Sequence, residues 1–174
     1  MKPLLIGQAP GPKTDPDDPL AANTVTGRRL AELCGLDQQA YTSAFQRANL
    51  LHYFPGRTGS DDRFPIREAR AAALALRPFL RGRSIIMIGR GVAQAFGYRR
   101  ADLPFCEQRL NERWGFFYSC IPHPSGRNRA YNEQQTREQV SSFINRLLNP
   151  LERGMLVYDK EIVADGSPVS DDRA

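Results

Sequence analysis

The sequence predicts an α/β fold with three αβα layers and a central four-stranded, mainly parallel sheet. Four short apolar segments alternate with segments of helical periodicity. This alternation favours parallel strands whose helical connections cover both faces of the sheet. At 174 residues the chain is long enough for one such domain. We expect it over residues 1–158, followed by an acidic tail over 159–174 whose polar composition predicts disorder.

Four segments are predicted to form the strands. Each is short and mostly apolar, and three of them run directly into glycine or proline, where a loop can begin. The segment Ser84–Ile88 is apolar throughout, which is typical of a strand covered on both faces. The predicted strands are 4–6, 48–51, 84–88 and 115–121.

The connecting helices are predicted from periodicity and from end signals. Leu30, Leu33 and Cys34 recur at helical spacing, and Gly35 after them is suited to a helix end. Asp37 can cap a short helix that runs to residue 45. Further helices are predicted over 65–80, with Pro65 in the favoured first position, over 91–96, and over 130–148, where Val140, Phe143, Ile144, Leu147 and Leu148 form an apolar stripe; irregular loops are predicted over 8–23 and 55–59.

The distribution of charge favours a nucleic-acid partner. Lys and Arg number 24 against 19 Asp and Glu, a net charge of +5. The 16 residues from Asp159 to Ala174 carry a net −3, which leaves about +8 on the rest of the chain, almost all of it arginine. The planar guanidinium group pairs well with phosphate. A solvated basic surface without a specific partner is the alternative.

Composition disfavours membrane and metal functions. No apolar run approaches the roughly 18 residues that would span a bilayer, and the N-terminus turns polar too soon for a signal peptide. We therefore expect a cytoplasmic protein, and a monomer. The cysteines are odd in number and scattered, and with only two histidines we expect thiols in or near the core and no zinc site. These residues are Cys34, Cys106, Cys120, His52 and His123.

Polar segments follow three of the predicted strands, at 7–11, 49–53 and 122–128. In a sheet of this kind ligands bind beyond the carboxyl ends of the strands. We therefore expect the three segments to converge on one crevice. A fourth segment, Gly89-Arg90-Gly91, partly matches a dinucleotide-binding fingerprint, but Gln94 stands where the third glycine is needed, and we interpret it as a tight strand-to-helix turn.

Two of these segments carry candidate chemistry. The first is Gly7-Gln8-Ala9-Pro10-Gly11, a sharp turn whose exposed N–H groups can bind an anion or position a water; an ordinary structural turn is the alternative. The second is His123-Pro124-Ser125-Gly126-Arg127-Asn128, which places an imidazole, a hydroxyl and a guanidinium within six residues. So many polar groups build a core poorly, so a functional role is favoured over a structural one.

Taken together and in this order, the two motifs resemble the signature motifs of the uracil-DNA glycosylase superfamily. Asn49-Leu50-Leu51 is similar to the asparagine-bearing strand end of that family, and 84–89 to its central strand. The resemblance covers residues 3–148. In style the first motif is closest to the bacterial branches with Gly-Glu-Ala-Pro-Gly.

The resemblance implies a base pocket. Asn49, with Gly7 and Ala9, would bind the base, its amide pairing with N3–H and O4 of uracil and disfavouring cytosine. His123 would hydrogen-bond O2 and stabilise the negative charge of the departing base. Gln8 would hold the attacking water near the anomeric carbon of the sugar.

The resemblance also implies contacts to DNA. Ser125 and the nearby backbone would grip a phosphate, and Arg127 would enter the duplex where a nucleotide has flipped out. The remaining DNA-binding positions that it implies are Pro10, Gly11, Gly126 and Asn128.

Some positions depart from the family pattern. Ala9 stands where many members carry Asp or Asn, and Gln8 replaces a glutamate, so it can orient water but cannot act as a general base. The four iron–sulfur cysteines of the bacterial branches are missing, so no cofactor is expected. Residues 12–35 contain no aromatic residue to stack on the base, and Tyr53 or Phe54 could substitute. Gly11 lies near the position where some relatives exclude the methyl group of thymine.

Three functions remain open on these grounds. The first is hydrolytic removal of uracil or a related damaged base from DNA. The second is a module of the same fold that binds DNA or a flipped base with little or no cleavage. The third is an enzyme acting on free nucleosides or nucleotides, for which weak, salt-insensitive DNA binding is expected.

Overall fold

The computed structural model describes residues 1–59, 61–125 and 128–149, and its centre is a mixed sheet of five strands. Their order is β2 (Gln46–Asn49), β1 (Leu4–Gly7), β5 (Ser84–Ile88), β7 (Phe116–Ile121) and β6 (Arg109–Asn111). The first four pair in parallel, while β6 pairs antiparallel with β7. The prediction of four strands was therefore wrong in number. The added strand is three residues long and mostly exposed, so it has no apolar pattern to predict it.

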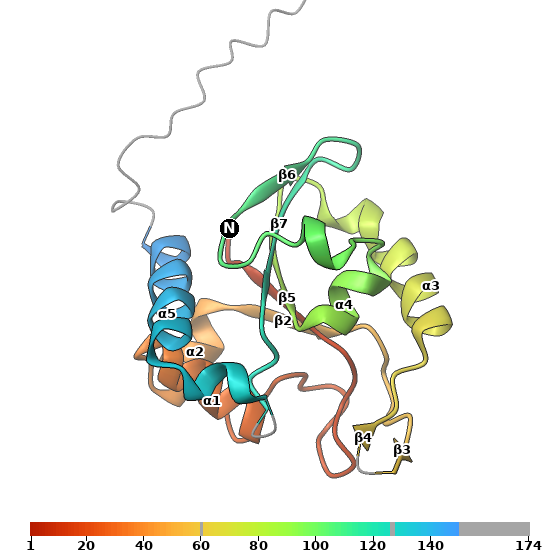
Figure 1. Cartoon of the computed structure of the whole chain (residues 1–174), viewed down its shortest axis with the longest axis horizontal. Helices are drawn as coiled ribbons and strands as arrows, with labels where there is room; N and C mark the ends of the chain where they lie inside the picture. The colour runs from red at the N-terminus through yellow and green to blue at the C-terminus, as the bar shows by residue number, and fades with distance from the viewer. Residues whose placement is uncertain (60, 126–127, 150–174) are drawn as a thin grey trace, which may run out of the picture.

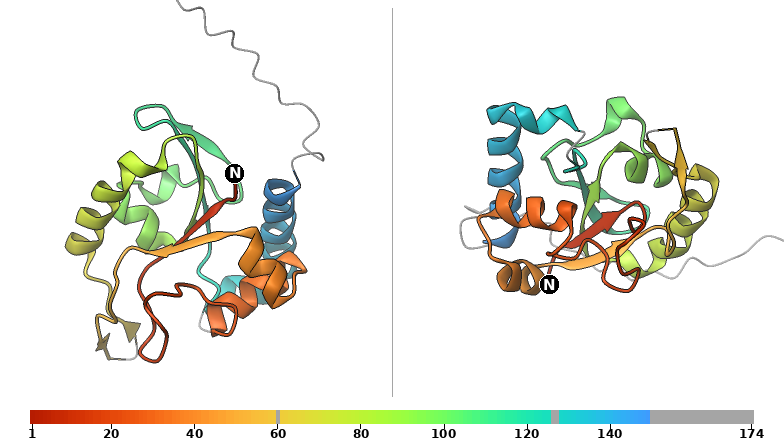
Figure 2. Two further views of the ribbon diagram at one scale, coloured as in Figure 1. Left: turned by 180° about the vertical axis from the view of Figure 1, so that it is seen from behind. Right: turned by 90° about the horizontal axis from the view of Figure 1, so that it is seen from below.

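Helices cover both faces of this sheet, an arrangement compatible with the predicted three layers (Figures 1 and 2). On one face α3 (Ile66–Leu76) and α4 (Arg90–Ala95) pack on the sheet, and on the other α1 (Val25–Cys34), α2 (Gln38–Ala44) and α5 (Gln134–Leu148) do so. The alternation along β1 serves both faces, because Leu4 and Ile6 enter the first core and Leu5 the second. Of the predicted apolar stripe of α5, Val140, Phe143, Ile144 and Leu147 are buried.

The ends of α1 and α2 follow the signals in the sequence. The Thr24 hydroxyl accepts a hydrogen bond from the Gly27 N–H at 3.1 Å, and Gly35 ends α1 with φ of 65°. Asp37 caps α2 by accepting from the Ala40 N–H at 2.7 Å.

Two helix predictions and one strand prediction need correction. The helix expected over 65–80 is split into α3 and a 3₁₀ turn, η1 (Arg77–Leu80), because Pro78 has no N–H to donate; Pro65 is the capping residue rather than the first helical one. The helix expected over 130–148 is likewise divided into η3 (Arg129–Asn132) and α5. The strand expected over 48–51 begins two residues earlier and ends at Asn49.

A small hairpin and a 3₁₀ turn complete the described chain. The region expected as a loop at 55–59 begins a small antiparallel hairpin of β3 (Arg57–Thr58) and β4 (Asp61–Asp62), and a 3₁₀ turn, η2 (Arg100–Asp102), precedes β6. None of the helices described is both long enough and apolar enough to span a membrane. The tail predicted over 159–174 lies outside the described residues.

Candidate functional site

The segments that follow the parallel strands meet at one edge of the sheet, as the strand order predicts. Gly7 is in register with Asn49, and beyond the strands the Leu51 N–H still donates to the Gln8 carbonyl at 3.0 Å. On the next pair of strands the Gly89 N–H donates to the Ile121 carbonyl at 2.8 Å, two residues before His123. These strand ends and the β3–β4 hairpin lie on one side of the molecule (Figure 1 and Figure 2, right).

Three glycines leave the space that the candidate side chains occupy. A β-carbon on Gly91 would lie 2.6 Å from Nε2 of Gln8, and one on Gly89 would lie 3.0 Å from the β-carbon of His123. Gly7 makes the same allowance for the Asn49 amide oxygen, which lies where its β-carbon would be. At Gly89 a φ of 89° favours glycine a second time.

Gln8 and His123 line the same cavity, whose volume is about 660 Å³. That is within the range of pockets that hold small molecules or a nucleobase. Gly89, Arg90 and Gly91 form one wall. The remaining lining residues are Leu103, Phe105, Cys120, Ile121, Pro122, Asn128, Ala130 and Thr136.

Asn49 lies at the same sheet edge but on the other face. Gly7 and Asn49 are register partners, so their side-chain directions agree, whereas Gln8, which follows β1, points toward Gly91 of α4 on the opposite face. Asn49 therefore does not line the cavity with Gln8 and His123, and the expectation that all three polar segments converge on one crevice was wrong for the segment 49–53. A β-carbon on Gly7 would meet both the Asn49 amide oxygen and the Leu20 side chain, and Leu20 has the left-handed φ of 54° that is uncommon for leucine.

The Asn49 amide oxygen has no hydrogen-bond partner among the described residues, although the side chain is nine-tenths buried. A buried acceptor left unpaired costs about 1–3 kcal/mol, and such groups are rare unless water, an ion or a ligand satisfies them. The amide oxygen is thus enclosed by its neighbours without a donor, so a ligand can pair with it only if one of those neighbours moves.

His123 is half-buried and favours its neutral form. Burial lowers the pKa of the imidazole below its ordinary 6.5, and the Asp62 carboxylate of the β3–β4 hairpin acts in the opposite direction as the smaller effect. Asp62 is itself paired with Arg57 at 3.3 Å. At neutral pH the ring is therefore an uncharged group with one N–H donor and one acceptor.

Side-chain hydrogen bonds hold the loop that carries His123 in place. Asn128 donates to the His123 carbonyl at 2.9 Å and accepts from the Ala130 N–H at 3.1 Å, so it caps η3 and fixes the loop together. The Tyr131 hydroxyl donates to the Pro122 carbonyl at 2.7 Å. Because its amide is used in this way, Asn128 positions the loop.

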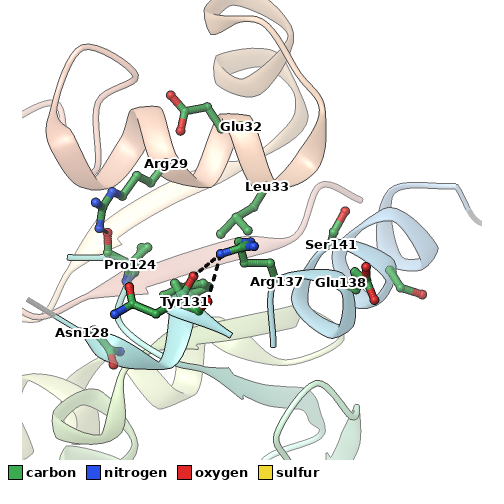
Figure 3. Close-up of a pocket in the computed structure, with 11 residues that line it drawn as sticks. Arg29, Glu32, Leu33, Pro124, Asn128, Tyr131, Arg137, Glu138 and Ser141 are labelled. Atoms are coloured by element: carbon green, nitrogen blue, oxygen red, sulfur yellow. Dashed lines mark hydrogen bonds between the residues drawn. The ribbon is translucent and has the colours of Figure 1, made fainter. Parts of the chain in front are cut away.

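A second cavity of about 630 Å³ lies behind this loop, between α1, η3 and α5 (Figure 3). Its arginines are engaged with the backbone: Arg29 donates to the Pro124 carbonyl at 3.4 Å and Arg137 to the Tyr131 carbonyl at 2.7 Å. Glu32 and Glu138 also line it, so its charge is mixed. Gln8, Asn49 and His123 do not line it, and we take it as a support of the loop rather than the site.

The other predicted positions of the first motif have structural surroundings. Ala9 packs against the core, Pro10 is buried, and the Gly11 carbonyl accepts from the Thr14 hydroxyl at 3.0 Å. Of the second motif, Ser125 is half-buried in the loop, whereas Gly126 and Arg127 lie outside the described residues.

The aromatic residues suggested for stacking are not in the cavity. Tyr53 instead donates its hydroxyl to the Glu68 carboxylate, and neither it nor Phe54 lines the cavity. Phe105 does line it and is 43% exposed, which makes it a stronger candidate. It lies in a loop without a periodic pattern, so nothing in the sequence distinguishes it. Arg90 and Gly91, by contrast, directly follow an apolar strand, a signal that we assigned only to a turn.

The cavity offers neither a thiolate nor a clustered metal site. Burial raises the pKa of Cys120 to about 11, so it is a thiol at neutral pH and a poor nucleophile. Within the described part of the chain, no three His, Cys, Asp or Glu side chains are grouped to hold a metal ion. Besides the Cys120 thiol, the polar side chains that line the cavity are two amides, a hydroxyl, a neutral imidazole and a guanidinium, from Gln8, Asn128, Thr136, His123 and Arg90.

A scan against models of known protein families found no match for this chain, and a search of the curated proteins found none either.

Proposed function

We propose that this protein is a DNA N-glycosylase of the uracil-DNA glycosylase type, which hydrolyses the bond between sugar and base at uracil or a related damaged base. The observation that carries the proposal is the set of three glycine-backed side chains, Gln8, Asn49 and His123, at one edge of a parallel sheet. These are the residues that the family motifs nominate independently of any geometry.

The unpaired oxygen of Asn49 supports a role in base recognition. Uracil presents an N–H donor beside a carbonyl acceptor, and one amide side chain can satisfy both. A base laid across the strand end at Gly7 would give this oxygen the hydrogen bond that no described residue supplies. Cytosine presents a different pattern on the same edge and would leave the amide oxygen or its own amino group mispaired.

His123 and Gln8 fit a hydrolysis in which the base departs early. As the C–N bond breaks, its electron pair leaves with the base, and a neutral imidazole can donate its N–H to the base oxygen on which negative charge develops. Water then adds to the sugar carbon, and its proton is passed to solvent or to the departed base. Gln8 would orient that water through its amide.

A second candidate is a module that binds a flipped base without efficient cleavage. It is favoured by one observation: among the described residues no carboxylate lines the cavity, so a general base for the water is lacking. A neutral amide can orient the water but cannot accept its proton.

Base release from a panel of oligonucleotides tests the proposal and separates the two candidates. The panel carries uracil, hypoxanthine, xanthine or an oxidised pyrimidine, in single and double strands, with an unmodified strand as control. Abasic product from one substrate, lost in His123→Ala, is the expected result. Selective binding of a modified strand without product would favour the binding module. Equal, weak affinity for every strand and no product would contradict both.

A further inference from the structure

A further hollow of about 540 Å³ lies beside the candidate site, where α3, α4 and the segment leading to η2 meet. We name it the arginine pocket, after the three arginines that line it. Arg70 comes from α3, Arg90 is the first residue of α4, and Arg99 directly precedes η2. Gln94, Tyr98 and Leu103 also line it.

The three arginines have no neutralising partner among the described residues. None of them forms an ion pair or donates a hydrogen bond there, whereas Arg47 and Arg109 pair with carboxylates. No Asp or Glu lines the pocket either. Like charges gathered without a counter-charge repel one another, so a bound anion would stabilise this arrangement. The cavity behind the His123 loop differs in both respects, since it contains carboxylates and its arginines are bonded to the backbone.

Two contacts hold Tyr98, which lines the arginine pocket. The Tyr98 ring stacks on Tyr118, with 4.3 Å between ring centroids and 14° between planes. Its hydroxyl accepts a hydrogen bond from the Asn111 side chain at 2.7 Å. An aromatic ring among guanidinium groups is a combination that proteins use to bind single-stranded nucleic acid.

The arginine pocket adjoins the site cavity. Arg90 and Leu103 line both, so an extended ligand that occupies the cavity is close enough to reach the pocket. A polymer with an anionic backbone fits both hollows at once, whereas one small anion fits a single hollow.

We propose that the arginine pocket binds the phosphodiester backbone of the strand whose base enters the cavity, through Arg70 and Arg99, at nucleotides next to the target. This inference rests on the proposed function. Its contacts are to phosphate, so it predicts affinity that is independent of sequence and sensitive to salt.

The test measures affinity for an unmodified oligonucleotide of about 16 nucleotides, by fluorescence anisotropy between 50 and 200 mM salt, a length that covers both hollows. The variant Arg70→Gln/Arg99→Gln is compared with the wild type. The matched control is Arg81→Gln/Arg113→Gln, which removes the same charge from exposed positions at the amino ends of β5 and β7, the opposite edge of the sheet. We expect the pocket variant to bind about tenfold more weakly at low salt and its salt slope to fall by about 1.4, for two lost phosphate contacts, with the control within about twofold of the wild type. Equal weakening in both variants would overturn the proposal, because net charge alone would explain it.

Two further measurements identify the ligand and separate this inference from the proposed function. Calorimetry with inorganic phosphate tests whether the pocket binds a small anion instead of a strand. If the pocket variant loses phosphate binding but keeps its affinity for the strand, the proposal is overturned.

Base release from a long and a very short substrate is then compared. We expect the pocket variant to lose efficiency only on the long one. Release that is unaffected on both, with unchanged affinity, refutes the pocket and leaves the glycosylase standing. Absence of release in the wild type, with strand affinity lost in the pocket variant, refutes the glycosylase and leaves the pocket standing.

Discussion

Replacing Gly91 by alanine should separate the stability of this protein from its activity. The new β-carbon would lie 2.6 Å from Nε2 of Gln8, while an ordinary contact begins at 3.4 Å. The amide must therefore retreat by about 0.8 Å. Because Nε2 is the far end of a flexible side chain, this movement costs little energy, but it displaces the group that we propose to hold the attacking water.

The effect on stability should be small, because two contributions oppose each other. Gly91 is the second residue of α4, and alanine is favoured over glycine in a helix by up to about 1 kcal/mol. Against this, the Phe64 ring lies 3.2 Å from the new β-carbon and must shift by a few tenths of an ångström. We expect the free energy of unfolding to change by less than about 1 kcal/mol, which is a change in Tm of about 4 °C at most.

The effect on activity should be large. A misplacement of about 1 Å in a reacting group can cost roughly a hundredfold in rate. Single-turnover base release from the best substrate of the oligonucleotide panel measures this step without product release. We expect a fall of that order for Gly91→Ala.

A double-mutant cycle with Gln8→Ala identifies the cause. If the alanine acts through Gln8, the double variant should be no slower than Gln8→Ala alone, since the displaced group is already gone. Rates that multiply across the two changes would refute the reasoning, as would full activity in Gly91→Ala with the fold intact.

Three further outcomes are expected. Asn49→Ala should abolish base release but change the free energy of unfolding by less than about 1 kcal/mol, because the lost packing is offset by removal of an unpaired buried oxygen; chemical denaturation checks it, and a loss above 3 kcal/mol would contradict it. The wild type should lose stability relative to His123→Gln as the pH falls below 6.5. The pKa of His123 is lowered in the folded state, so below 6.5 the unfolded chain binds more protons than the folded one. Thermal melts from pH 8 to 5 measure the difference in stability between the two proteins, and a difference that stays constant with pH would contradict the prediction. Tyr131→Phe should lower Tm by about 2–4 °C, because the Pro122 carbonyl loses its donor at a cost of about 1 kcal/mol, and an unchanged melt would show that water replaces that bond.

The parallel core of the fold was predictable because its signals are local. The four parallel strands, the caps of α1 and α2 and the stripe of α5 each follow from spacing or from one capping residue. What the sequence did not indicate lacks such a signal. The strand β6 has three mostly exposed residues, and its pairing with β7 is a tertiary event. The break after α3 was visible in Pro78, but the apolar pattern that continues past it concealed the change to a 3₁₀ turn.

The sheet edge at which the candidate residues lie was predictable, but the face toward which each side chain points was not. Strand order is sufficient to bring Gln8, Asn49 and His123 to one edge, because parallel strands end together. Which face each side chain takes depends on register to the single residue. A shift of one position between β1 and β2 would place Asn49 on the side of Gln8. The role of the glycines that contact these side chains could not be predicted from the sequence either, because Gly89 and His123 meet only when β5 pairs with β7.

The separation of Asn49 from Gln8 favours a ligand that crosses the end of the sheet. A small molecule confined to the cavity would meet Gln8 and His123 but leave the Asn49 oxygen unpaired. A nucleotide is long enough to engage both faces, with its base at one strand end and its sugar at the next. The unpaired Asn49 oxygen and the left-handed backbone of Leu20 each cost free energy, and packing alone does not explain why both are kept. A nucleotide laid across Gly7 is the one ligand considered above that reaches both faces, and free nucleobase binding as strong as strand binding would be inconsistent with this geometry.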